Sequence, residues 1–397
     1  MKSENILVFD VETSTISKGH PFDPRNRLVS YACVSNGDIT FKYYTDPDFI
    51  PFLKGAVERA DCLIGFNIKF DIHWLANVGI KLRTNHKVWD CQLAEFIYTG
   101  QEHRFASLND TCKEYGLPVK TDLVAEYWNQ GVSTENIPLS ILKEYNCWDV
   151  RLTKMLFDVQ QRMLSEKQKR LVWLEGEDLK TLQAAEWAGV KFDTAKADEK
   201  VAKYTSDING IERLLNDYLP DGIPEGAFNY DSGDHLSALL YGGEIQFKWA
   251  TESPAVYKTG EKAGQSYIQR RWFTTAIPFD QRFKPLEGTE VKKTAEDPSA
   301  TTRFYQTDAP TLKQLKSRKK ENGVLLELLA ERSGKIKVVE MVESIMGKIK
   351  NMNWQDDLIH PQYNQNVVIT GRLSSSAPNM QNTPVEVDEL LVSRYAD

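Results

Sequence analysis

The sequence predicts an α/β domain with a mixed central sheet, followed by a mainly α-helical region. Two observations predict this order: the first 160 residues alternate short apolar runs with helix-like stretches, and long helical patterns dominate from about Glu166. A chain of 397 residues is also long enough for two or three domains. We therefore predict domains at 1–165 and 166–397, with an insertion at about 244–308.

Short apolar runs in the first half predict four strands, and helical spacing predicts helices between and after them. The predicted strands are Ile6–Phe9, Leu28–Val34, Ile39–Tyr44 and Cys62–Phe66. The predicted helices are Phe49–Arg59, Ile72–Val78, Leu93–Tyr98 and Ile141–Arg162. Asn36-Gly37 lies between the second and third strands and is a hairpin signal. Strands followed by alternating strands and helices favour a mixed sheet.

The second half contains long helices separated by turns and one irregular stretch. Helical patterns cover Gln168–Gly189, Thr194–Leu219, residues 228–243 and Leu312–Lys350. Gly189 is expected to end the first of these helices and to be followed by a strand. The insertion contains two predicted strands around Ser266–Thr275, which favours a β-hairpin.

Composition and charge fit a globular protein of a reducing compartment. The chain is 41% hydrophobic and 26% charged, with a net charge of −7. A nucleic-acid partner would therefore be bound by local basic patches on an acidic background. The five cysteines form no CxxC pair, and we find no secretory leader and no apolar run long enough to cross a bilayer. We expect a soluble, cytoplasmic protein with no membrane partner.

Four acidic residues lie where strands or helices would present them to one site. Asp10 and Glu12, two apart on the first strand, share a face. Asp71 follows another buried strand, and Asp149 lies one helical turn after Tyr145. Carboxylates without His or Cys partners suit Mg²⁺ or Mn²⁺, and two such ions about 4 Å apart would clamp a reacting phosphodiester. A tyrosine with its usual pKa is expected to position water rather than to act as a base.

The order of these residues resembles the three exonuclease motifs of the DEDD superfamily, in its tyrosine-bearing branch. The resemblance covers the first half of the chain and implies a ribonuclease H-like fold. It implies 3′→5′ exonuclease activity with two divalent metal ions, which releases nucleoside 5′-monophosphates from DNA 3′ ends. It further implies that Asp10, Glu12 and Asp149 hold the tighter ion, that Asp71 supports the second ion, and that Tyr145 holds the water.

Two segments of the second half are interpreted from a second resemblance to a known family. A Thr-Gly-Arg-Leu-Ser-Ser run, followed by Pro-Asn-x-Gln-Asn-x-Pro at residues 370–384, is similar to the sequence that leads into the palm of family A (bacterial DNA polymerase I-like) enzymes. The residues it implies for primer–template DNA are Arg372 and Gln381, with Thr370, Asn379 and Asn382 ordering the region. Basic residues that include Lys335 and Lys337 fall at the family's thumb, where they either track duplex phosphates or form a solvated face.

In that family the two polymerase aspartates and the fingers helix follow this signature, whereas the sequence runs to Asp397 without them. We therefore expect this chain not to polymerise alone, and to be a fragment or to act with a second polypeptide that carries palm and fingers. Split polymerases of bacteriophages suggest a phage source by analogy. The 244–308 insertion, with its Arg270, Arg271 and Trp272, is a candidate for binding DNA or a processivity factor.

The sequence leaves open alternatives for the role of Asn67 and for the function of the chain. Asn67 either caps the helix that follows it or contacts the substrate. The chain is alternatively a stand-alone DEDD exonuclease acting on RNA or DNA ends, which the 370–384 signature disfavours. A non-catalytic subunit that holds DNA for a split polymerase is a third hypothesis, which the four carboxylates disfavour.

Overall fold

The computed structural model describes residues 5–257, 259, 262, 264–291 and 304–393. The chain divides into two compact units. The first unit consists of Met1–Asp198 and Met341–Asp397, and the second is Glu199–Glu340. Residues 292–303 of the expected insertion lie outside the described residues.

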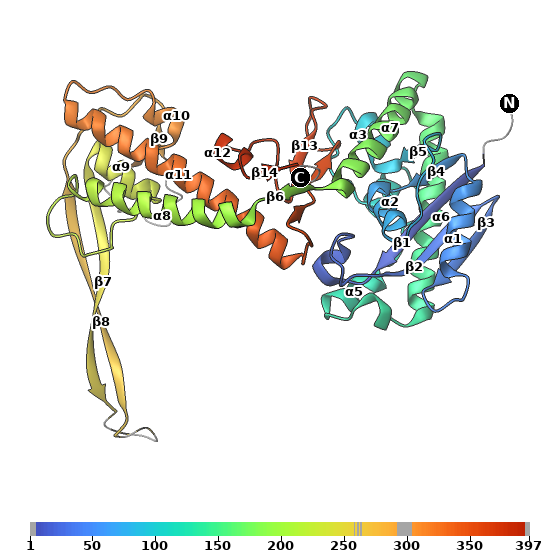
Figure 1. Ribbon diagram of the computed structural model, residues 1–397, viewed down its shortest axis with the longest axis horizontal. Helices are drawn as coiled ribbons and strands as arrows, with labels where there is room; N and C mark the ends of the chain where they lie inside the picture. The colour runs from blue at the N-terminus through green and yellow to red at the C-terminus, as the bar shows by residue number, and fades with distance from the viewer. Residues whose placement is uncertain (1–4, 258, 260–261, 263, 292–303, 394–397) are drawn as a thin grey trace. The chain divides into compact units, whose positions relative to one another are not determined.

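A five-stranded mixed sheet forms the centre of the first unit (Figure 1), with the order β3-β2-β1-β4-β5. The strands are β1 Ile6–Thr13, β2 Leu28–Ser35, β3 Asp38–Tyr43, β4 Cys62–Gly65 and β5 Lys87–Asp90. The helices are α1 Phe49–Arg59, α2 Ile68–Asn77, α3 Cys91–Tyr98, α4 Leu108–Glu114, α5 Leu123–Asn129, α6 Leu139–Met163 and α7 Glu166–Ala188, with short 3₁₀ turns η1 Ile16–Gly19 and η2 Thr134–Asn136. The first three strands are antiparallel, and β4 and β5 run parallel to β1. This confirms the mixed sheet and the ribonuclease H-like fold.

Side-chain alternation along β1 decides which residues face which layer of helices. The odd-numbered residues from Leu7 to Val11 pack in a core with α1 and α2, whereas Val8 packs in the core formed with α6. Successive side chains of a strand point to opposite faces. Asp10 and Glu12 therefore project to the same side as Val8, toward α6.

A tight turn and a close helix–strand contact shape the sheet and the helices that cover it. Asn36 and Gly37 both adopt positive φ, 52° and 90°, which is the turn that the Asn-Gly pair predicts. Helix α7 packs closely on β5, because a Cβ on Gly176 would lie 2.1 Å from the Val88 carbonyl oxygen. β5 was not predicted, because it is a four-residue strand that passes into α3 with no turn residue between them.

The C-terminal segment is built into the first unit. Its elements are β11 Leu358–Ile359, β12 Gln362–Asn364, β13 Ser374–Ser376, α12 Val385–Asp388 and β14 Leu391–Val392, and β11 and β14 flank β6, Val190–Phe192. The carboxylate of Glu186, at the end of α7, is buried and accepts from Lys69 Nζ at 2.6 Å and from Tyr363 N at 2.7 Å. The segment that follows Leu358 thus shares a buried polar contact with α2.

The second unit combines helices with a long hairpin. Its elements are most of α8 Thr194–Asn216, α9 Gly233–Tyr241, β7 Gly243–Val256, β8 Ser266–Phe279, β9 Glu290–Val291, β10 Phe304–Tyr305, α10 Ala309–Leu312 and the first part of α11 Lys320–Asn351. The hairpin β7–β8 extends away from these helices (Figure 1), as the expected β-hairpin does. The helix expected over Leu312–Lys350 begins only at Lys320. None of the helices in the described ranges combines the length and the apolar character that a bilayer-spanning segment needs.

Candidate functional site

Three carboxylates meet on the α6 side of the sheet. One oxygen each of Asp10, Glu12 and Asp149 lies within 4.8 Å of the others. Strand alternation supplies the first two, and α6 presents the third where it crosses β1 and β2. Glu12 and Asp149 are only 8% and 6% exposed. The residues fit a hard divalent cation, because the donor set is all oxygen and several negative charges converge on one place.

Burial and mutual repulsion raise the pKa values of this cluster. Burial, followed by the charge of Asp149, raises the pKa of Asp10 from its ordinary 3.8 to about 8. Burial and then the Asp10 charge raise the pKa of Glu12, and likewise that of Asp71, well above their ordinary values. Carboxylates in this state bind protons or cations rather than remain all ionised.

A buried asparagine holds the first carboxylate in place. Asn146 Nδ2 donates to Asp10 Oδ2 at 2.7 Å, and Ser30 Oγ donates to Asn146 Oδ1 at 3.3 Å. Asn146 is fully buried. Partners of this kind orient the ligands of a metal site. The sequence analysis did not single out Asn146, although it follows Tyr145 directly in the third motif.

Asp71 lies outside the group of three. It belongs to the first turn of α2, and its Oδ1 accepts at 2.9 Å from the backbone N of Val11, which lies between Asp10 and Glu12 on β1. Its charge still acts on Glu12, whose pKa it helps to raise. The structure therefore brings together three of the four predicted carboxylates as one group and places the fourth beside them.

Asp90 was not predicted and organises the start of α2. Its buried carboxylate accepts from Asn67 N at 2.9 Å, from Ile68 N at 3.1 Å and from Gln92 N at 2.8 Å. Burial raises its pKa to about 6. Asp is a preferred N-cap residue, and its position just before α3 is the sequence signal that could have identified Asp90. By fixing the turn before α2, Asp90 fixes the position of Asp71.

Asn67 occupies the N-cap position of α2 in a left-handed conformation, with φ of 57°. Its side chain makes no capping hydrogen bond, and the residue is exposed. Asn67 therefore lies at the cap position that one of the two alternatives expects, without a side-chain hydrogen bond to the helix. A contact with the substrate stays a prediction.

Lys120 was not predicted to belong to the site. Its Nζ lies 2.5 Å from each carboxylate oxygen of Asp149 and 3.3 Å from the centroid of the Tyr145 ring. Burial, followed by the charges of Glu12 and Asp149, raises the pKa of Tyr145. The phenol thus stays protonated at neutral pH, as the expected water-positioning role requires.

A pocket of about 410 Å³ opens beside Glu12. The aromatic side chains of Phe70 and Trp128 line it, together with the exposed Lys18. Trp128 also packs edge-on against Tyr145, with ring centroids 6.0 Å apart. The pocket therefore places two aromatic rings and a cation next to the carboxylates.

The residues expected to contact primer–template DNA differ in their surroundings. Thr370, Arg372, Asn379, Gln381 and Asn382 are all exposed. On α11, Lys337 is exposed, whereas Lys335 Nζ forms an ion pair with Asp207 at 2.9 Å. Lys335 thus has an ion-pair partner within the chain, which the basic pattern of the sequence does not predict.

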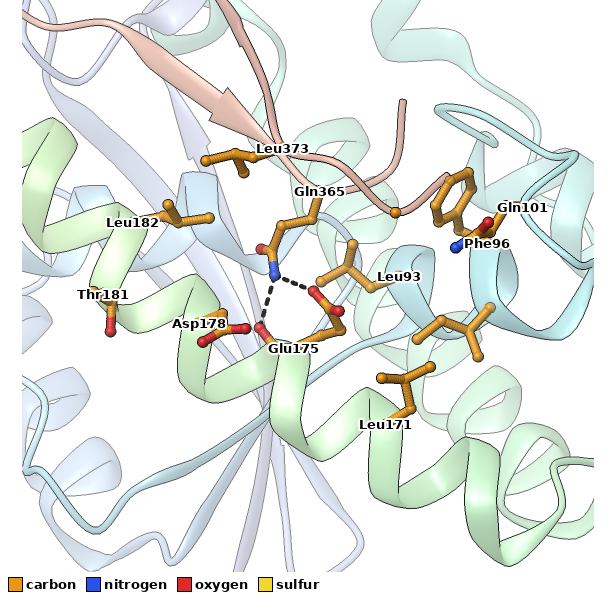
Figure 2. Close-up of a pocket in the computed structure, with 12 residues that line it drawn as sticks. Leu93, Phe96, Gln101, Leu171, Glu175, Asp178, Thr181, Leu182, Gln365 and Leu373 are labelled. Atoms are coloured by element: carbon orange, nitrogen blue, oxygen red, sulfur yellow. Dashed lines mark hydrogen bonds between the residues drawn. The ribbon is translucent and has the colours of Figure 1, made fainter. Parts of the chain in front are cut away.

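Gln365 lies just after β12, in the polar segment that leads to residues 370–384. It lines a cavity of about 260 Å³ between α3, α7 and residues 371–373. Figure 2 shows its side-chain amide directed at Glu175, to whose backbone oxygen Nε2 donates at 3.0 Å and to whose Oε2 it donates at 2.5 Å. Gln365 therefore joins the polar segment to α7. The cavity lies in that contact, apart from the group of three carboxylates.

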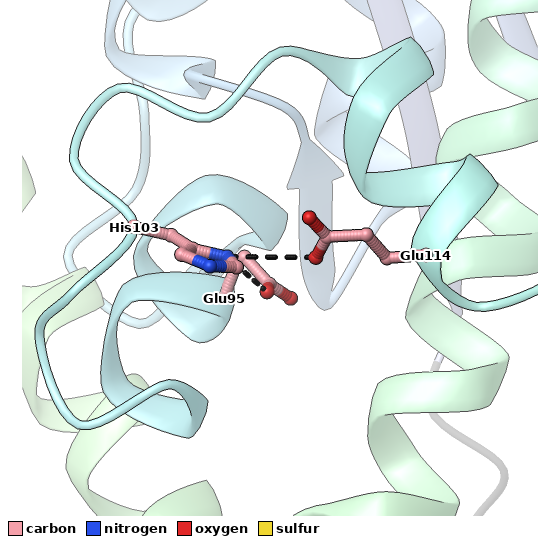
Figure 3. A group of neighbouring side chains, drawn as sticks. All are labelled: Glu95, His103 and Glu114. Atoms are coloured by element: carbon pink, nitrogen blue, oxygen red, sulfur yellow. Dashed lines mark hydrogen bonds and ion pairs between the residues drawn. The ribbon is translucent and has the colours of Figure 1, made fainter.

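A second cluster of possible ligands consists of Glu95, His103 and Glu114 (Figure 3). His103 Nδ1 lies 3.3 Å from Glu95 Oε1 and 3.5 Å from Glu114 Oε2, and Tyr115 Oη donates to the other Glu95 oxygen at 2.6 Å. The His103 and Glu114 side chains are 41% and 53% exposed. We interpret this cluster as an ion-pair network that ties the loop after α3 to α4.

Comparisons with protein families match both halves of the chain. Residues 2–165 match the model of the 3′-5′ exonuclease domain, and residues 283–395 match that of DNA polymerase family A. Among curated proteins, the DNA polymerase of Bacillus phage SP01 is 24% identical over 87% of this chain and 37% of its own length. DNA polymerase I of Synechocystis is also 24% identical, over 81% of this chain and 27% of its own length. The chain thus spans about a third of the length of these relatives.

A solved structure with a similar fold is the POL domain of Pol1 from M. smegmatis, in complex with DNA primer-template and dNTP. The TM-score is 0.62 at 19% identity, and the match covers 96% of this chain and 52% of that one. At this identity the likeness concerns the fold.

Proposed function

We propose that this chain hydrolyses the last phosphodiester at DNA 3′ ends. It belongs to the family A DNA polymerases, and it carries their 3′-5′ exonuclease domain with part of their polymerase domain. The observation that carries the proposal is the grouping of Asp10, Glu12 and Asp149 within 4.8 Å, beside a pocket lined by aromatic rings. The products are nucleoside 5′-monophosphates.

Exonuclease domains of this kind use divalent metal ions. We assign to this chain two Mg²⁺ or Mn²⁺ ions, held by Asp10, Glu12 and Asp149, with Asp71 supporting the second ion. When bound, such ions supply hydroxide near neutral pH and neutralise the charge that develops on the phosphate.

The chain's own residues position the substrate and the water. The Tyr145 hydroxyl orients the attacking water, while Asn146 keeps Asp10 in place. Phe70 and Trp128 offer ring faces to the terminal bases of a single strand, and such stacking contributes about 1–3 kcal/mol per base. We place Lys18 and Asn67 at the sugar-phosphate backbone, since Lys18 lines the pocket and Asn67 is exposed at the start of α2, the helix that carries Phe70.

The wider role is proofreading in DNA replication. The exposed residues of the 370–384 segment, with Arg372 and Gln381 foremost, would contact the primer–template backbone. Lys337, on α11, supplies a phosphate contact, and Lys335 does so only if it leaves Asp207. The enzyme works where replicating DNA is, which we take to be the cytoplasm of a bacterium or of a phage-infected host.

We assign polymerisation to the palm and fingers of the family, which act with this chain either on a longer chain or on a second polypeptide. The distal part of the β7–β8 hairpin is the candidate surface for DNA or a processivity factor. Trp272 and Ile268 are 67% and 65% exposed there, and Arg271 lies near them. Exposed apolar side chains of this size indicate a binding surface.

Two other functions account for fewer of these observations. A stand-alone exonuclease does not account for the family A match over residues 283–395. A subunit that only holds DNA does not account for three carboxylates, two of them buried, that share one place.

The experiment is digestion of a 5′-labelled single-stranded DNA with Mg²⁺, comparing the wild-type chain with Asp10→Ala. A ladder that shortens from the 3′ end with the wild type, and not with the variant, is the expected result. Intact DNA with both proteins, although both bind DNA, would contradict the proposal and favour the DNA-holding function.

A further inference from the structure

Lys120 brings a positive charge into the carboxylate cluster. Its Nζ contacts both oxygens of Asp149 at 2.5 Å, and its side chain is 7% exposed. The same charge counteracts the rise in the pKa values of Asp10 and Glu12. One ammonium group therefore acts on all three clustered carboxylates.

The position of Lys120 is fixed by its backbone. Asn109, on α4, donates from Nδ2 to the Lys120 carbonyl oxygen and accepts from Lys120 N at its Oδ1, each at 3.2 Å. Two residues later, Asp122 caps α5 by accepting from Ala125 N at 2.9 Å. The loop that carries Lys120 is thus tied to a helix on each side.

The ammonium group also rests on the ring of Tyr145, 3.3 Å from its centroid. Contacts of this kind are attractive, and more so when the pair is removed from water. Because Tyr145 and Asp149 are one helical turn apart on α6, a single cation sets the position of both.

This arrangement blocks the position between the two Asp149 oxygens, where a metal ion would contact both of them. An ammonium group that touches both oxygens of a carboxylate occupies the place along the carboxylate axis where a cation would bind. A divalent ion at Asp149 would also repel a neighbouring Lys120 charge, and in a site with little water this repulsion is large. The two cations must therefore compete for Asp149.

We propose that Lys120 is the resident cation of the metal-free site, which holds Asp10, Glu12 and Asp149 together until a divalent ion takes Asp149 and displaces it. The inference rests on the proposed function, in which Asp149 is a metal ligand. The flexible lysine stem lets the head group leave while the clamped backbone stays. Lys120 is a positioning residue, because it acts through Asp149 and Tyr145.

The first test is Mn²⁺ binding to the whole 397-residue chain, measured by electron paramagnetic resonance. Lys120→Met should bind Mn²⁺ roughly tenfold more tightly than the wild type, which corresponds to about 1.4 kcal/mol. Lys113→Met removes an exposed charge on α4 and should leave the affinity unchanged. Unchanged or weaker binding by folded Lys120→Met would overturn the proposal.

The second test uses the wild-type chain, so it does not depend on whether a variant folds. Acetylation of lysines by an activated ester, followed by mass spectrometry, should modify Lys120 slowly in EDTA and several times faster with Mn²⁺, while Lys113 reacts at one rate. Equal or slower modification of Lys120 with Mn²⁺ overturns the proposal. A chain that gives both expected responses but digests no DNA contradicts the proposed exonuclease function and leaves this inference standing.

Discussion

His73 Nε2 lies 2.6 Å from Glu186 Oε2, a contact between two buried side chains that joins α2 to the end of α7. Lys69 Nζ contacts the other oxygen of the same carboxylate. α2 carries Asp71, so this contact supports one wall of the candidate site from a part of the chain beyond residue 165.

Removing this carboxylate is expected to destabilise the first unit strongly. Glu186→Ala should lower the free energy of unfolding by about 3 kcal/mol, because it leaves Lys69 and His73 without their buried partner. Glu166→Gln is the control, since the Glu166 side chain is 89% exposed in its ion pair, and it should change stability little. Urea unfolding monitored by circular dichroism measures both. Equal stability of the two variants would show that the buried contact is not important for folding.

The same contact bears on the proposed domain boundary near residue 165. A fragment of residues 1–165 contains the range that matches the exonuclease family but lacks Glu186 and Tyr363. We expect it to melt at a lower temperature than the same unit in the whole chain. A fragment that melts at the same temperature would support 1–165 as an independent domain.

Stability of the metal-free chain should depend on pH through Asp10. Burial, with the charge of Asp149, raises the pKa of this carboxyl from 3.8 to about 8, so the folded state binds its proton more tightly than the unfolded state. The stability that this proton contributes is therefore complete below about pH 4 and is lost as the pH rises through about 8. Melting temperatures in EDTA between about pH 5 and pH 8 should fall more for the wild type than for Asp10→Asn. Parallel curves for the two proteins would contradict the assigned pKa.

Metal binding should release protons for the same reason. Ligand carboxyls must ionise to bind a cation, and the Asp10 carboxyl, with its pKa raised to about 8 by burial and the Asp149 charge, holds a proton at neutral pH in the metal-free site. Calorimetric titration with Mg²⁺ in buffers of different ionisation enthalpy should show proton release near pH 7 that is smaller near pH 9. Proton uptake, or release that does not change with pH, would be inconsistent with this cluster as the ligand set.

The pocket beside Glu12 is expected to bind the end of a single strand. Phe70→Ala or Trp128→Ala should raise KM for a short single-stranded DNA by roughly tenfold, since a lost stacking contact is equivalent to about 1–3 kcal/mol. Phe105→Ala removes an aromatic ring that is 58% exposed on another loop and should leave KM unchanged. If the pocket variants behave like Phe105→Ala, the strand binds elsewhere.

Gly19 permits a close approach of the loop that follows β1. It has φ of 68°, and a Cβ added to it would lie 2.1 Å from Thr13 Oγ1. Gly19→Ala should therefore displace the chain next to Glu12 and reduce exonuclease activity. Gly79→Ala is a matched control, because Gly79 has φ of 79° with nothing within 4 Å of the added Cβ. The control should lose a similar amount of stability to backbone strain and keep its activity.

The sequence predicted the site best where local geometry determines it. Asp10 and Glu12 are two apart on a strand, so any sheet that buries Leu7 and Phe9 on one face presents both carboxylates on the other. Asp149 follows from helical spacing with Tyr145. These predictions depend on neighbours in the sequence.

What the sequence could not predict are partners that only the fold brings together. Lys120 lies on a loop between two short helices that the periodicity missed, and its partner Asp149 is 29 positions away. Lys335 is one lysine among several on a basic helix, and its ion pair depends on Asp207 of α8. The number of lysines in a sequence does not reveal which of them form ion pairs in the fold.

The most direct test of the central claim is the identity of the product released from 3′-end-labelled single-stranded DNA in Mg²⁺. We expect the wild-type chain to release the labelled terminal nucleotide first, as a 5′-monophosphate. We also expect that Asp149→Asn loses this release while Asp110→Asn, a change of an exposed aspartate, keeps it. Labelled oligonucleotides as the first products, or full activity of Asp149→Asn, would contradict the assignment of a 3′-5′ exonuclease to this carboxylate cluster.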